Sequence, residues 1–162
     1  MRFPDKTRVL EGIVAALSGT LAQLAKGVAE IRQGATHAEA KPENDKDTRA
    51  LEQSYLARGQ AMRAEALADE LVLLRSLELS TLGPDDIIRA GALIALEDDD
   101  GTRCVFLAPH GGGVSFEVDG VAVTVVTPVS ALGRALLGRQ VGDDVEVRVR
   151  NSVRTLSIVA IA

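Results

Sequence analysis

The segment Lys41-Pro42-Glu43-Asn44-Asp45-Lys46-Asp47 decides how this chain folds, because it separates two long helical patterns. Proline has no backbone N–H to donate, and it moves the preceding residue out of the helical region. Pro42 therefore predicts a break, and a short break between two long helices makes them antiparallel. The segment carries three carboxylates, and Glu39 lies just before it. We expect a helical hairpin whose acidic tip, residues 39–47, is the working end.

The residues before the break predict one long helix, from 7 to about 39. Its apolar residues recur at alternating intervals of four and three: Leu10, Val14, Leu17, Leu21, Leu24, Val28 and Ile31. This spacing is the a/d seam of a coiled coil, not the broader apolar face of a globular helix. Gly12, Gly19 and Gly27 each weaken the helix by up to ~1 kcal/mol relative to alanine. The seam therefore needs a partner helix.

Residues 45 to about 78 predict that partner. Asp45 or Asp47 can cap its N-terminus, where a negative charge also suits the helix dipole. Its base carries a leucine seam, and the same register continues toward the tip in small and polar residues: Leu74, Leu71, Leu67, then Ala64, Gln60, Ala57, Gln53 and Ala50. We expect a hairpin that is tightly packed at its base and more loosely packed near its tip.

A domain boundary is expected at Leu82-Gly83-Pro84-Asp85-Asp86, where the pattern changes. Beyond it the apolar residues alternate with period two, which predicts strands. We expect strands at 92–96, 102–107, 114–118, 121–125, 145–149 and 156–161, and a short helix at 130–137. The predicted fold class is α+β, with a coiled-coil hairpin over residues 1–80 and a small, mainly antiparallel sheet domain over residues 81–162.

The composition excludes several classes of function. Aromatic residues make up only 2% of the chain and the net charge is −5, which argues against base-stacking or electrostatic binding of nucleic acid. We expect no signal peptide and no membrane span, hence a cytoplasmic protein. The single cysteine, Cys104, lies in an apolar run and is expected to be a buried thiol.

A family resemblance rests mainly on residues 126–147. The run Ser130-Ala131-Leu132-Gly133-Arg134-Ala135-Leu136-Leu137-Gly138, followed by Gly142-Asp143 and Val145-Glu146-Val147, strongly resembles the signature of the GreA/GreB transcription elongation factors. That signature is close to S-P-L-G-R-A-L-L-G-K-x-x-G-D-x-V-x-V. Glu43-Asn44 and Glu52-Gln53 are similar to the family's tip and the start of its second helix.

The resemblance implies a fold, a partner and a mechanism. The sheet domain would be FKBP-like and would dock on RNA polymerase at the secondary channel, through Ser130, Ala131, Leu132, Gly133 and Arg134. The protein would act as a monomer, and its tip would enter that channel. It would contact nucleic acid only indirectly, within the elongation complex. The tip acids Glu43, Glu39, Asp45 and Asp47 would act in trans on the polymerase Mg²⁺ site, with Glu43 sharing a Mg²⁺ ion. The protein would need no cofactor of its own and would not itself be an enzyme.

The sequence departs from the family pattern at two places. The family tip is close to G-D-x-x-E-N, and Ala40 stands where its aspartate would be, three residues before Glu43. Ala131 stands in place of the family's docking proline. Two activities therefore stay open: stimulated cleavage of backtracked RNA, or modulation and inhibition of the polymerase without cleavage. For Asp45, Asp47 and Glu39, helix capping and ordinary solvation are the competing explanations.

Other functions fit the residues less well. A peptidyl-prolyl isomerase would need several aromatic pocket walls, and the sheet domain offers only Phe106 and Phe116, both in strand patterns. The heptad spacing of the first helix would also allow a coiled-coil dimer that serves as a scaffold. The short break at residues 41–47 instead favours a chain that folds back on itself. The run His110-Gly111-Gly112-Gly113 is similar to a lipase oxyanion loop, but the chain contains no G-x-S-x-G motif. Two histidines and one cysteine do not make a structural zinc site.

Overall fold

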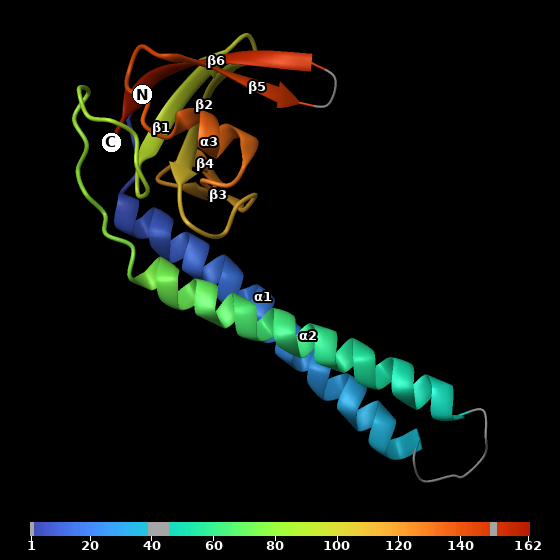
Figure 1. The fold of residues 1–162 in the computed structure, drawn as a ribbon. Coiled ribbons are helices and arrows are strands. Elements are labelled where there is room, and N and C mark those ends of the chain that lie inside the picture. Colours follow the sequence, from blue (N-terminus) through green and yellow to red (C-terminus); the bar gives the residue numbers. More distant parts are fainter. Residues whose placement is uncertain (1, 39–45, 150–151) are drawn as a thin grey trace. The chain divides into compact units, whose positions relative to one another are not determined.

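The computed structural model describes residues 2–38, 46–149 and 152–162. It divides into two compact units, which we call the sheet unit (Met1–Ala15 with Leu73–Ala162) and the hairpin unit (Ala16–Val72). The elements run in the order α1 (Lys6–Ala38), α2 (Lys46–Arg75), β1 (Leu93–Asp98), β2 (Gly101–Leu107), β3 (Ser115–Val118), β4 (Val121–Val126), α3 (Ala131–Leu136), β5 (Asp144–Val149) and β6 (Ser152–Ile161) (Figure 1). The predicted α+β class, with long helices before a sheet and one short helix, is confirmed.

The strands form one six-stranded sheet in the order β3-β4-β2-β1-β6-β5. The sheet is mainly antiparallel, as expected, with one parallel pair: β2 runs alongside β4 from Cys104 opposite Val123 to Leu107 opposite Val126. The other neighbouring strands are antiparallel. The parallel pair arises because the β3–β4 hairpin is placed outside β2, so that β4 returns alongside β2 in the same direction.

The core of the sheet unit lies between the sheet and α3. Leu136 of α3 is fully buried, and Leu132 and Ala135 pack against the same cluster. The cluster also includes residues from β1, β2, β5 and β6, such as Ile94, Val105 and Ile158. Cys104 is buried, as predicted. Its neighbours exclude water, and this burial raises the pKa of its thiol to about 11.

The first turns of α1 belong to the sheet unit and use a different face from the predicted seam. Val9 and Ile13 are fully buried, whereas Leu10 and Val14 are only partly buried. The ring of Phe116 lies over Gly12, where a β-carbon would come within 2.5 Å of the ring atom Cε2. The glycine that weakens the helix in isolation therefore makes room for an aromatic ring of β3.

Polar contacts also hold the start of α1 within the sheet unit. Arg8 forms an ion pair with Asp119, and the Asp5 backbone N–H donates to the same carboxylate at 3.2 Å. The Lys6 ammonium donates to the Ser80 carbonyl oxygen at 2.7 Å. Its partial burial, and then the nearby positive charge of Arg89, lower the pKa of Lys6.

In the hairpin unit, α1 and α2 lie side by side (Figure 1). The predicted seam holds here: Leu17 and Val28 of α1 and Ala57 and Leu71 of α2 are buried. Gln60 lies against Gly27, where a β-carbon would come within 2.9 Å of its side-chain oxygen. Gln53, predicted to continue the seam, is exposed. The contact between the helices therefore weakens toward the tip, as expected for small and polar seam residues.

By length and composition alone, Lys6–Gly34 of α1 is long and apolar enough to cross a membrane. This is weak evidence, because one such helix near the start of a chain is also typical of soluble core helices and signal sequences. The buried apolar residues of this helix are Val9, Ile13, Leu17 and Val28.

Candidate docking surface and acidic tip

The turn that leads into α3 is fixed by Ser130. Its hydroxyl donates to the Thr127 carbonyl oxygen at 2.7 Å and accepts from the Gly133 backbone N–H at 3.0 Å. The second contact is a standard N-cap, which satisfies one of the N–H groups that the first turn of a helix leaves without a partner. Ser130 is therefore a positioning residue that sets where α3 begins.

Gly133 is required by a close approach between α3 and the preceding strand end. A β-carbon at this position would lie far inside contact distance of the Thr127 carbonyl oxygen. Because that atom is backbone, it cannot rotate away as a side chain would. Gly133 is buried, and with the Ser130 cap it locks α3 against Thr127.

The remaining predicted docking residues divide by exposure. Ala131 and Arg134 are exposed, while Leu132 is partly buried against the core. The Arg134 guanidinium donates to the Val129 carbonyl oxygen at 2.5 Å, which holds the side chain back over the start of the helix. Of the five predicted residues, only Ala131 and Arg134 are thus exposed.

Two exposed apolar residues were missed by sequence reasoning. Val129 is 77% exposed and Leu137 is 40% exposed. Ala131 and Arg134 are three residues apart and share one side of α3, Leu137 is the residue directly after the helix, and Val129 is joined to Arg134 by the hydrogen bond above. We call these four residues the α3 surface. The signal available in the sequence was that these two apolar residues flank the short helix on either side.

The C-terminal part of the chain matches one protein-family model, "Transcription elongation factor, GreA/GreB, C-term", over residues 83–162. The chain is a divergent member of the GreA/GreB family. The match spans β1 to β6 and contains the whole α3 surface, so the family is recognised by the same domain that carries the predicted docking motif.

Solved structures similar to this chain include Gre-family proteins. GreA factor homolog 1 (Gfh1) of Thermus thermophilus is 21% identical over 92% of this chain and 94% of that chain, with a TM-score of 0.39. Gfh1 of Thermus aquaticus is 21% identical over 91% of this chain and 92% of that chain, with a TM-score of 0.39. A GreA/GreB factor from Nitrosomonas europaea is 18% identical over 59% of this chain and 78% of that chain, with a TM-score of 0.38. A search of curated proteins found no match.

Most of the predicted tip of this Gre-family chain lies outside the described residues. That holds for Glu39, Glu43 and Asp45, while Asp47 is the second residue of α2 and its side chain is not described. The described backbone places the end of α1 at Ala38 and the start of α2 at Lys46. Among the described residues, no group of three or more metal-ligating side chains comes together.

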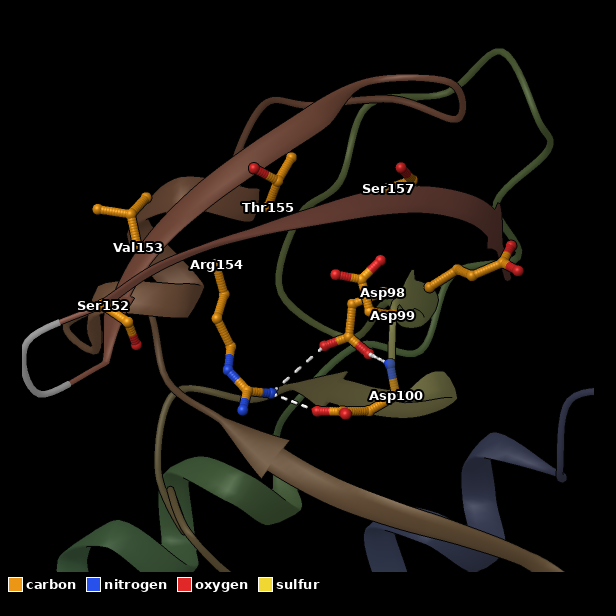
Figure 2. Close-up of a pocket in the computed structure, with 9 residues that line it drawn as sticks. Asp98, Asp99, Asp100, Ser152, Val153, Arg154, Thr155 and Ser157 are labelled. Atoms are coloured by element: carbon orange, nitrogen blue, oxygen red, sulfur yellow. Dashed lines mark hydrogen bonds and ion pairs between the residues drawn. The ribbon is translucent and has the colours of Figure 1, made fainter.

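A cavity of about 710 Å³ lies between the β1–β2 turn and β6 of this Gre-family domain. Figure 2 shows Arg154 reaching from β6 toward Asp98 and Asp100. Arg154 contacts the Asp100 carboxylate at 2.6 Å and the Asp98 carboxylate at 3.8 Å. The Asp98 side chain is 7% exposed and also pairs with Arg103. Because these charges are paired with one another, the cluster ties β6 to the turn.

The isomerase alternative finds no support in the described part of the chain. Phe106 is fully buried in the core, and Phe116 packs on Gly12. Neither aromatic ring is therefore available as a wall of an open proline-binding pocket. The cavity in Figure 2 is lined by carboxylates, hydroxyls, an arginine and a valine, which is a different chemistry.

Proposed function

We propose that this GreA/GreB-family protein is a transcription elongation factor that binds RNA polymerase and presents its acidic tip to the polymerase active site through the secondary channel. The observation that carries the proposal is the family match over residues 83–162, which includes the α3 surface. The protein regulates a reaction whose catalytic groups belong to the polymerase. It works in the cytoplasm and binds the polymerase as a monomer.

The α3 surface is the proposed contact with the polymerase. It combines two exposed apolar side chains, Val129 and Leu137, with the charge of Arg134. An exposed apolar anchor beside an arginine is the composition that protein interfaces favour at their centre. Ser130 and Gly133 support this contact indirectly, because they fix the position of α3.

The tip acids are the proposed active end. Carboxylate oxygens are the ligands that Mg²⁺ prefers, and two-metal phosphoryl chemistry depends on how firmly the second metal is held. Glu43 matches the glutamate of the family tip, and its carboxylate would help to hold that shared ion in the polymerase site. Glu39, Asp45 and Asp47 would add negative charge around it. In this form, the factor stimulates cleavage of backtracked RNA by the polymerase.

A second function is favoured by Ala40. An alanine side chain has no oxygen to offer a metal, so the tip lacks the aspartate that the family pattern pairs with its glutamate. A tip with one matched acid would occupy the channel and modulate or inhibit synthesis without stimulating cleavage. The two functions share the binding step and differ only in what the tip does at the active site.

One experiment tests the binding and separates the two activities. Backtracked elongation complexes are mixed with the protein and Mg²⁺, and the release of short 3′ RNA and the rate of elongation are both measured. Accelerated release that is lost in Glu43→Ala supports cleavage stimulation, whereas slowed elongation without release supports the inhibitory function.

Two variants act as controls. Arg134→Glu alters the α3 surface and should abolish either effect by preventing binding. Glu52→Ala removes an exposed carboxylate of α2 outside the proposed tip and should leave the effect intact. If the unaltered protein does not bind core polymerase at micromolar concentration, both proposed functions are wrong.

A further inference from the structure

The second helix carries two seams on opposite faces. The inner seam, which includes Ala57 and Leu71, is buried against α1. The outer seam consists of seven exposed residues at alternating intervals of four and three: Leu51, Tyr55, Arg58, Met62, Glu65, Asp69 and Val72. Intervals of four and three are the a/d spacing of a coiled coil. An isolated two-helix hairpin needs only the inner seam, so the outer one is unexplained.

The apolar members of the outer seam are large and well exposed. Tyr55 is 66% exposed, Met62 is 62% exposed and Val72 is 63% exposed. Scattered apolar residues are normal on a protein surface, but these recur in register along most of one helix. A face of this kind is suited to packing against another helix of the same periodicity.

The charged members of the outer seam select the partner and its direction. Arg58 lies in the half of the seam nearer the tip, and Glu65 and Asp69 lie in the other half. A second copy in parallel alignment would place Arg58 opposite Arg58 and Asp69 opposite Asp69, which is repulsive. An antiparallel copy places Arg58 opposite Asp69, and the complementary charges then attract.

The same antiparallel register also aligns apolar residues of the seam, except Leu51, which falls opposite Ser76 just past the end of α2. With Arg58 opposite Asp69, the two-fold axis brings Tyr55 opposite Val72 and Met62 opposite the aliphatic part of Glu65. The contacts at each end of the seam are identical, as a two-fold interface requires. The surface is therefore complementary to itself in one alignment.

We propose that the outer seam of α2 is a self-association surface through which two copies of this protein pair in an antiparallel α2–α2 contact. A single helix pair is a small interface, so the affinity is in the micromolar range. The paired form covers the hairpin, and it therefore competes with insertion of the hairpin into any partner. The inference does not depend on the proposed function, because it concerns the protein alone.

Sedimentation velocity on the full chain, from low to high micromolar concentration, tests the proposal. We expect a concentration-dependent monomer–dimer equilibrium for the unaltered protein. Met62→Gln should raise the dissociation constant at least about tenfold. Leu56→Gln is the matched control, because Leu56 is 55% exposed but lies one residue beyond Tyr55 and hence ~100° around the helix from it. The control should leave the equilibrium unchanged.

A charge exchange tests the direction of pairing. Arg58→Glu and Asp69→Arg should each weaken the dimer, because each places like charges opposite one another. The double variant should restore it, and in a parallel dimer it would not. Circular dichroism confirms that each variant keeps its helices.

Three results would overturn the proposal. The first is a monomer at every concentration. The second is a dimer that Met62→Gln does not weaken, which would place the interface elsewhere. The third is a monomeric protein in which Met62→Gln instead weakens binding to polymerase, which would assign the outer seam to that partner.

Discussion

The ring of Phe116 in β3 packs directly on the backbone of α1 at Gly12. This contact joins the start of the first helix to an edge strand that lies about a hundred residues later in the chain. It gives a physical reason for a glycine at a position where alanine would make a better helix.

Gly12→Ala should therefore destabilise the protein in spite of its helix propensity. The new β-carbon would come within 2.5 Å of the Phe116 ring, so the ring must move. Overpacking typically costs about 1–3 kcal/mol, which exceeds the gain of up to ~1 kcal/mol from replacing a helical glycine. Chemical denaturation of the two proteins measures the difference.

Gly19→Ala is the matched control for this prediction. No atom lies within 4 Å of the added β-carbon at Gly19, so the same substitution should stabilise the helix by up to ~1 kcal/mol. If Gly12→Ala also stabilises the protein, Phe116 is not packed as described. Combining Gly12→Ala with Phe116→Leu should recover part of the loss.

Gly133→Ala should be more damaging than Ser130→Ala. The first forces a β-carbon into the Thr127 carbonyl oxygen, which can be relieved only by moving backbone, and we expect a loss of at least about 2 kcal/mol. The second removes the N-cap of α3, which costs about 1 kcal/mol. Thermal unfolding of both variants ranks them. Ser130→Asp keeps a capping oxygen and should remain near the stability of the unaltered protein.

The buried thiol of Cys104 predicts a loss of stability at high pH. Burial raises its pKa from 9.0 to about 11 in the folded protein. The folded state therefore disfavours the thiolate. The contribution of the protonated thiol to the free energy of unfolding is full below pH 9 and is lost as the pH rises toward 11. The slope approaches about 1.4 kcal/mol per pH unit in that window. Comparing pH profiles of unfolding for the unaltered protein and Cys104→Ala isolates the thiol's contribution, because the two proteins differ only at this side chain.

An aspartate introduced at position 40 should show whether this position decides between cleavage stimulation and inhibition. If the proposed function is right, Ala40→Asp adds an oxygen ligand at the family position and should raise stimulated RNA cleavage at least about tenfold. Ala40→Asn, similar in size but uncharged, is the control and should change little. Equal cleavage by all three proteins would show that position 40 does not govern activity.

The helices and strands were predictable because their signals are local. The four-and-three spacing that contains Leu17 and Val28 predicted a paired helix, and alternation predicted β4. The Ser130–Leu137 helix was predicted to within a residue at each end, since Ser130 is a strong cap and Gly138 a strong stop.

Contacts between distant segments were not predictable in the same way. The parallel pairing of β2 with β4 depends on where a hairpin is placed, and alternation is the same for either direction. β6 begins at Ser152, earlier than the predicted Leu156, because its first residues pair with β5 and are exposed, so they carry no apolar pattern. Gly12 looked like a simple cost to the helix because Phe116 approaches it from far along the chain.

The strand order has a consequence for how the domain forms. β1 pairs with β6, and the Leu93 backbone exchanges hydrogen bonds with Ala162 at 3.0 and 2.9 Å, so a central seam of the sheet joins segments separated by most of the domain. Closing so long a loop is entropically expensive, and domains rich in non-local pairing fold slowly. While the chain is being synthesised, β1 and β2 can pair with each other, but the other edge of β1 stays unpaired until β6 has been made. That interval is when a nascent chain of this protein is most exposed to aggregation and most in need of a chaperone.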